Sequence, residues 1–157
     1  MRRKHRIQRP LRPDPKFNSL IVAKFVNYLM VGGKKTVART VFYDAMSDVE
    51  AKKKDPMDTF SKALQNITPR MELRSKRVGG ANYQIPYEVA PERGVFLAMK
   101  WLIDASRKKK GASMAKRLSS EVLDASSEAG EAFRKKQEVH KMADANKAFA
   151  HFGRRRK

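Results

Sequence analysis

The chain has 157 residues, a usual length for one folded domain, and 41% of them are apolar, which excludes disorder along the whole chain. Lys and Arg number 36 against 16 Asp and Glu, and the resulting formal net charge of +20 indicates a polyanionic partner, most simply nucleic acid. The absence of cysteine excludes disulfide bonds, cysteine-bound zinc and thiol chemistry, and is compatible with a reducing cytosol.

A membrane is the competing anionic partner, and the sequence argues against it. The longest apolar candidate, from Ser19 to Val31, is interrupted by Lys24 and Asn27 and falls short of the roughly 20 residues of a spanning helix. The opening Met1-Arg2-Arg3-Lys4 is not followed by the apolar stretch of a secretory signal. We therefore expect a cytoplasmic location, with a bacterial source favoured and an organelle left open.

Residues 1–16 are predicted to form an extended basic arm. Three prolines oppose a helix there, and the apolar content is too low for packing. Such an arm would become ordered on RNA, and a solvated terminus is the alternative. Its basic residues are Arg2, Arg3, Lys4, Arg6, Arg9, Arg12 and Lys16.

Three helices are predicted to follow the arm. The first is capped by Asn18 or Ser19, carries apolar residues at helical spacing and ends at Gly32-Gly33. The second is capped by Thr36, and the third opens at Asp55-Pro56, a cap residue followed by proline at the first helical position.

The turn between the first two helices combines Gly32-Gly33 with Lys34 and Lys35. It does not match a nucleotide-binding loop, because Lys35 stands where Ser or Thr is needed and the preceding segment is helical. Backbone amides at a helix start, flanked by two lysines, still suit a single RNA phosphate. A plain helix–helix turn is the alternative.

A β-hairpin is predicted at about residues 70–90, where the spacing of side chains changes from helical to alternating. Gly79-Gly80-Ala81-Asn82 forms the turn, and Pro86 is tolerated because both strands of a ribbon are edge strands. Its cations would neutralise phosphates, and Tyr83 could stack on an unpaired base. A solvated ribbon whose charges only prevent aggregation is the alternative. The cations of the first strand are Arg70, Arg74, Lys76 and Arg77.

Helical spacing resumes after the hairpin and predicts three more helices. The fourth opens at Pro91-Glu92, the fifth is capped by Ser113, and Gly130 separates the fifth from a sixth that reaches Phe149. Residues 107–117 hold six basic residues and no acid, more than the dipole at a helix end requires, which favours phosphate contact. These are Arg107, Lys108, Lys109, Lys110, Lys116 and Arg117.

Catalysis has little support in the sequence. The three histidines, His5, His140 and His151, lie far apart, and no metal-binding spacing is present. We expect no enzyme activity, no metal, no cofactor and no small-molecule substrate.

Several longer motifs resemble the bacterial small-subunit ribosomal protein seven family. The resemblance covers about residues 12–152, in order and without large gaps, and the hairpin and last-helix motifs are long and specific. The motifs are Pro13-Asp14-Pro15-Lys16-Phe17, Gly33-Lys34-Lys35, Arg74 to Pro86 followed by Glu88-Val89, Pro91-Glu92-Arg93, Met114-Ala115, Arg117-Leu118 and His140 to Phe152.

The resemblance implies a structural protein that binds the 3′ major domain of small-subunit ribosomal RNA (rRNA) directly and organises assembly of the subunit head. Ribosomal proteins of the head and platform, exit-site transfer RNA and messenger RNA would be partners. Carried over by position, the rRNA-binding residues are the arm cations with Lys34, Lys35, Arg74, Lys76, Arg77, Arg93, the six basic residues of 107–117, and Met114. The resemblance also implies that a further set of residues faces the exit-site transfer RNA and messenger RNA: Gly79, Gly80, Ala81, Asn82, Tyr83, Lys147, His151 and Arg154.

The predicted fold is mostly α: one domain of about six helices over residues 17–152, with a protruding hairpin between the third and fourth helices, a basic arm at 1–16 and a basic tail at 153–157. A DNA-architectural protein is the runner-up, because basic ribbons also bend DNA. That class predicts a wedge residue at the ribbon tip, whereas this tip is Gly-Gly-Ala-Asn. An enzyme is a distant third.

Overall fold

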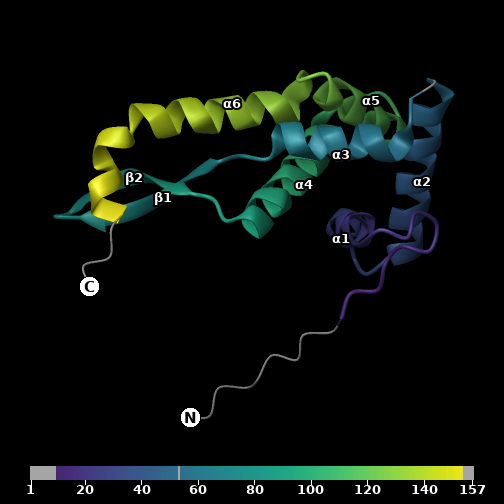
Figure 1. The fold of residues 1–157 in the computed structure, drawn as a ribbon, viewed down its shortest axis with the longest axis horizontal. Coiled ribbons are helices and arrows are strands. Elements are labelled where there is room, and N and C mark those ends of the chain that lie inside the picture. Colours follow the sequence, from purple (N-terminus) through teal and green to yellow (C-terminus); the bar gives the residue numbers. More distant parts are fainter. Residues whose placement is uncertain (1–9, 53, 154–157) are drawn as a thin grey trace, which may run out of the picture. The chain divides into compact units, whose positions relative to one another are not determined.

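A computed structural model describes residues 10–52 and 54–153 of the chain. Six α-helices, one 3-10 helix and one two-stranded sheet lie in this part (Figure 1). The mostly helical fold and the hairpin between the third and fourth helices confirm the prediction. In chain order the elements are α1 Leu20–Leu29, α2 Lys35–Ala51, α3 Pro56–Ile67, β1 Met71–Val78, β2 Ala81–Glu88, α4 Pro91–Lys108, α5 Met114–Ser126, α6 Gly130–Ala145 and η1 Lys147–Gly153.

The chain divides into two compact units, residues 1–40 and 41–157. The predicted domain boundaries at 16/17 and 152/153 stay a prediction. In the first unit, the Asp14 carboxylate is buried and accepts backbone N–H groups of Lys16 and Phe17 at 3.1 and 3.3 Å. This turn leads into α1, where the Ser19 hydroxyl accepts the N–H of Val22 at 3.5 Å. The described part of the predicted arm, residues 10–16, contains neither helix nor strand.

The core of the second unit lies among its helices. The rings of Phe42 and Phe60 meet edge to face at 5.4 Å, and Met99, Leu102 and Leu118 are fully buried. Two predicted caps are present, since the side chains of Asp55 and Ser113 accept backbone N–H groups at the starts of α3 and α5. Burial of these apolar side chains is the main source of stability of a helical body of this kind.

Two helix boundaries differ from the prediction. Helix α2 begins at Lys35, so Thr36 lies inside its first turn instead of capping it. Helix α6 ends at Ala145, and both the backbone N–H and the side-chain amide of Asn146 donate to the Met142 carbonyl, at 3.1 and 2.8 Å. The remaining residues up to Gly153 form the 3-10 helix η1.

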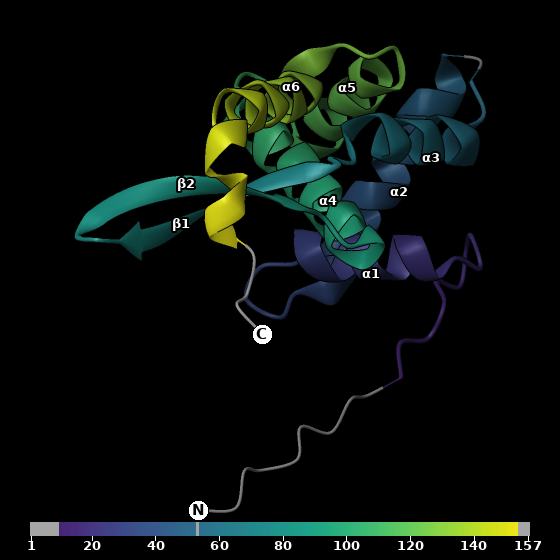
Figure 2. The same ribbon diagram turned by 60° about the vertical axis from the view of Figure 1, so that its left-hand side comes forward.

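The hairpin extends away from α3, α4 and α5, and α6 with η1 reaches along it (Figures 1 and 2). Met71 pairs with Glu88 at its root, and Val78 pairs with Ala81 at its tip. Gly79 and Gly80 form the two-residue turn with φ of +58° and +89°. Such a turn suits the right-handed twist of a ribbon, and glycine adopts its positive φ angles without steric cost.

Candidate nucleic-acid interface

The outer part of the hairpin carries three exposed cations, Arg74, Lys76 and Arg77. The only acid within β1, Glu72, is buried at the root and accepts hydrogen bonds from the guanidinium groups of Arg74 and Arg93. Burial alone would raise the pKa of Glu72, but these hydrogen bonds and charges outweigh it and hold the pKa below the usual value. The arginines therefore cancel the acid, and the exposed side of the strand stays cationic.

Arg74 and Arg93 serve the fold while remaining available to solvent. Their side chains are 62% and 47% exposed, although each is tethered to Glu72 and lies over an aromatic ring, Tyr87 for Arg74 and Phe96 for Arg93. An arginine has five N–H donors, so donors remain for a phosphate after the pairing with Glu72. The salt bridge fixes the direction in which they point.

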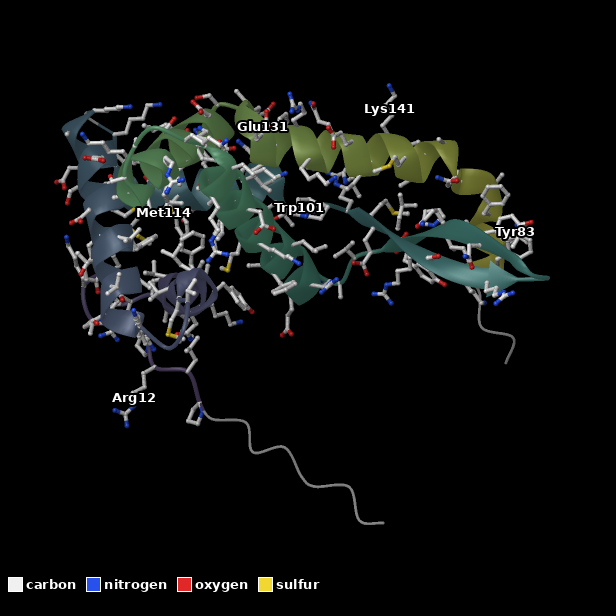
Figure 3. All side chains as sticks on the ribbon, turned by 180° about the vertical axis from the view of Figure 1, so that it is seen from behind. Arg12, Tyr83, Trp101, Met114, Glu131 and Lys141 are labelled. Atoms are coloured by element: carbon white, nitrogen blue, oxygen red, sulfur yellow. The ribbon has the colours of Figure 1, made fainter. Side chains whose placement is uncertain are left out.

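The hairpin is bound to the end of the chain. The Lys76 ammonium donates to the Phe152 carbonyl at 2.7 Å. The Tyr83 ring lies 5.1 Å from Phe149 and 5.4 Å from Phe152, and in Figure 3 it lies where η1 meets the ribbon. We name Tyr83, Phe149 and Phe152 the aromatic clamp. The clamp joins β2 to η1, which carries two of the predicted exit-site residues, Lys147 and His151. Both are exposed, as are Gly79, Gly80, Ala81 and Asn82 at the tip.

The clamp qualifies the prediction for Tyr83. Both neighbouring rings come from η1, and the tyrosine is half-buried instead of standing free as a platform for a base. Sequence reasoning missed Phe149 and Phe152 as partners of Tyr83, because they follow it by more than sixty residues and no local pattern connects them.

The basic segment 107–117 divides into outward and inward cations. Arg107, Lys108, Lys110 and Lys116 are exposed, and Met114 is half-buried. In contrast, Lys109 Nζ lies 2.8 Å from Glu121 Oε2, and Arg117 Nη1 donates to the Lys109 carbonyl at 2.6 Å. Burial alone would lower the pKa of Lys109, but hydrogen bonds to Glu121 and Asp124 raise it overall. The sequence shows six similar cations, whereas the structure turns Lys109 and Arg117 inward.

In the first unit, three cations line one pocket of about 260 Å³ next to residues 10–14. They are Arg12, which is exposed, and Lys35 and Arg39, which are half-buried. Lys34 is exposed at the Gly32-Gly33 turn, whose glycines have φ of +60° and +76°. Arg39 was not predicted from the sequence to be a binding residue.

The root of the hairpin is also attached to α6. The Nε2 atom of His140 accepts the backbone N–H of Arg70 at 3.1 Å. Lys136 Nζ donates to the Asn66 carbonyl at 2.6 Å, near the end of α3. These two bonds hold the entry to β1, and neither was predicted.

Some predicted binding residues lie outside the described part of the chain: Arg2, Arg3, Lys4, Arg6, Arg9 and Arg154. Within residues 10–52 and 54–153, no three His, Asp or Glu side chains gather in an arrangement able to hold a metal ion. None of the helices described there is long and apolar enough to cross a membrane.

Comparison with known proteins identifies the family. The family model described as "Ribosomal protein S7p/S5e" matches residues 1–147. The chain is 51% identical over 153 residues to the small ribosomal subunit protein uS7 of Marinomonas sp. (strain MWYL1), covering 96% of this chain and 98% of that one. It is 52% identical over 156 residues to the protein of the same name from Flavobacterium psychrophilum, covering 97% and 99%. It is 49% identical over 153 residues to that of Caulobacter vibrioides, covering 96% and 98%.

These matches span nearly the full length of each bacterial relative, including the hairpin, the basic loop and α6. They favour the ribosomal interpretation over the DNA-architectural one and over an enzyme. The chain therefore belongs to the ribosomal protein S7p/S5e family, and it is a structural, non-catalytic, RNA-binding protein of the small ribosomal subunit.

Proposed function

We propose that the chain binds the 3′ major domain of small-subunit rRNA directly and organises assembly of the subunit head. It acts as an electrostatic clamp, with exposed cations on the hairpin, the 107–117 loop and the arm each meeting RNA phosphates. Membership of a bacterial ribosomal family places it in the cytoplasmic ribosome. The remaining residues of the predicted rRNA-binding set stay predictions.

The observation that carries this proposal is the cluster of exposed cations on the outer part of β1. Arg74, Lys76 and Arg77 are exposed, whereas Glu72 is buried and paired with arginines. Exposed cations on a strand whose own acid is buried favour a polyanion, because each phosphate contact releases a condensed counterion. The ribbon is also held at its root by His140 and near its tip by the aromatic clamp, so less conformational entropy is lost on binding.

We further propose that the ribbon tip and η1 face the exit-site transfer RNA and the messenger path, next to ribosomal proteins of the head and platform. Gly79 and Gly80 have no side chains, so an RNA backbone can approach the turn closely. Exposed Lys147 and His151 lie on η1, which packs against β2. This side of the ribbon therefore offers hydrogen-bond donors and positive charge together.

A competition experiment tests the rRNA assignment. A labelled rRNA fragment of the head domain is bound at about physiological salt and challenged with duplex DNA and with an unrelated structured RNA. The proposal requires the head fragment to stay bound in large excess of both competitors. Equal displacement by duplex DNA would mean that the charge is generic and would reject the proposed clamp.

Charge variants locate the contact. Arg77→Ala is expected to weaken binding and to reduce the slope of log affinity against log salt by about 0.7 to 0.9. Lys141→Ala is the matched control, because this lysine is also exposed but lies on α6 outside the proposed interface (Figure 3). Equal effects of the two variants would indicate long-range attraction without a specific contact at the ribbon.

A further inference from the structure

The ammonium group of Lys109 is surrounded by three acceptors of α5. Its Nζ lies 2.8 Å from Glu121 Oε2, 3.0 Å from Asp124 Oδ2 and 3.1 Å from Ser120 Oγ. The Nζ donates hydrogen bonds to Asp124 Oδ2 and Ser120 Oγ and forms an ion pair with Glu121 Oε2. The side chain is 28% exposed, and its charge is balanced locally by two carboxylates. A phosphate would have to displace partners that are already in place.

The carboxylate of Glu121 faces two helices at once. The residue is fully buried, and while Oε2 meets Lys109, Oε1 accepts the backbone N–H of Ala132 in the first turn of α6 at 2.9 Å. A negative charge at this end of a helix is favourable because of the helix dipole. Gly130 makes the approach possible, since a Cβ there would lie 2.8 Å from Glu121 Oε1. One buried acid therefore joins the end of α4 to the start of α6.

Arg117 holds the same loop from the other side. Its Nη1 donates to the carbonyls of Lys109 and Arg107 at 2.6 and 3.3 Å, at the C-terminal end of α4. Donors from side chains commonly satisfy carbonyls at this end of a helix. The side chain thereby closes α4 and fixes the path of the chain into α5.

We infer that Lys109 and Arg117 are positioning residues, which hold the loop so that Lys108, Lys110 and Lys116 project together toward RNA. The geometry assigns the central role to the Glu121–Lys109 ion pair, which we name the ionic joint. The RNA part of this inference rests on the proposed function, whereas the structural part does not. Helix α6 runs from the ionic joint to the hairpin, so the joint also fixes the position of the helix that supports the ribbon.

Thermal unfolding of the free protein tests the joint without RNA. Lys109→Met leaves the Glu121 charge buried beside Asp124, and the unfolding temperature is expected to fall by about 5 °C or more. Lys110→Met is the matched control one residue away, with an expected change within about 1 °C because its side chain is exposed. Glu121→Gln in the Lys109→Met background removes the uncompensated charge while keeping an acceptor for Ala132, so it is expected to recover part of the loss.

Salt-dependent RNA binding separates positioning from contact. Lys109→Met is expected to weaken RNA binding, because the exposed lysines are no longer held in place, but to keep the wild-type slope of log affinity against log salt. Lys110→Met is expected to weaken binding and also to reduce the slope by about 0.7 to 0.9. If Lys109→Met proves too unstable to purify, Asp124→Asn, which removes one of the two negative charges around the Lys109 ammonium, is expected to lower the unfolding temperature without reducing the slope.

A reduced slope for Lys109→Met equal to that of Lys110→Met, together with an unchanged unfolding temperature, would overturn the inference. Loss of stability without recovery in the double variant would remove the ionic joint as its cause and would overturn it as well. If neither Lys109→Met nor Lys110→Met changes RNA binding, but Glu121→Gln restores part of the unfolding temperature of Lys109→Met, the ionic joint stands and the proposed function fails at this loop.

Discussion

The ammonium of Lys76 on the first strand of the hairpin donates a 2.7 Å hydrogen bond to the carbonyl of Phe152, 76 residues later in the chain. The bond crosses from the ribbon to η1 beside the aromatic clamp of Tyr83, Phe149 and Phe152. A two-stranded ribbon alone is marginally stable in water. The outer part of this ribbon is therefore stabilised by the last helix of the described chain.

Weakening the aromatic clamp is expected to loosen the ribbon while the helical body stays folded. Phe149→Ala deletes one of the two rings against Tyr83, and such aromatic pairs contribute about 0.5 to 1.5 kcal/mol each beyond the area they bury. Hydrogen exchange is the suitable measurement. Amides of residues 74–85 should exchange several-fold faster in the variant, whereas amides of α4 and α5 should not change.

Lys147→Ala is the control for the clamp, because this side chain is exposed on the same 3-10 helix. Its ribbon amides should exchange at the wild-type rate. An unchanged exchange rate in Phe149→Ala would mean that the ribbon is held by its root alone, and Lys76 and η1 would then have no part in ordering it.

The Glu72 salt bridges predict a dependence of stability on pH. Because the folded-state pKa of Glu72 lies below its usual value of 4.5, the contribution is fully present above pH 4.5 and is lost as the pH falls through the folded value. Glu72→Gln should lower stability by about 1 kcal/mol at pH 7, since both arginines are largely solvated.

Thermal unfolding of wild type and Glu72→Gln between pH 7 and pH 3 measures this contribution. The difference in unfolding temperature should shrink below pH 4.5. Glu88→Gln, at the exposed end of the second strand, is the control and should show little difference at any of these values. A difference for Glu72→Gln that stays constant down to pH 3 would exclude ionisation of this carboxylate as its source.

The turn glycines give a prediction about the ribbon tip. Gly80 has φ of +89°, and a Cβ there would meet no atom within 4 Å, so the cost of Gly80→Ala is purely conformational. We expect a loss of about 1 kcal/mol in ribbon stability. Faster exchange of the tip amides with an unchanged global unfolding temperature would show it, and an equal loss in Ala81→Gly would argue against the left-handed turn as the cause.

The local features of the fold could be predicted from the sequence because their causes are local. Ser19, Asp55 and Ser113 cap helices through their own side chains, and alternation with paired glycines specifies a ribbon. The predicted end of α6 was wrong by a few residues, because Phe149 continues the helical spacing of α6 in the sequence but lies in the 3-10 helix η1.

The roles of individual cations could not be predicted in the same way. Lys109 and Lys110 are neighbours in one basic run, yet the acceptors of Lys109 lie on the next helix. Likewise, nothing near Arg70 indicates that its N–H meets His140, 70 residues away. Charge composition predicts that a surface binds a polyanion, but the division between binding and positioning depends on contacts between helices.

His140 predicts a second pH-dependent contribution, at the root of the hairpin. Burial lowers the pKa of His140 below its usual value of 6.5, and Lys136 and Arg70 add to this effect while Asp144 opposes it. The neutral ring accepts the N–H of Arg70 through Nε2, and a protonated ring cannot. The unfolded chain therefore binds this proton more readily, so stability should fall as the pH drops below 6.5.

The variant His140→Gln keeps an acceptor but cannot titrate, so it separates the two effects. The unfolding temperature of wild type should fall between pH 7.5 and pH 5.5, and that of His140→Gln should fall less over the same range. His151→Gln, on exposed η1, serves as the control and should follow wild type. If His140→Gln follows wild type throughout, another group accounts for the pH dependence, and the bond between α6 and the first strand does not depend on the charge of His140.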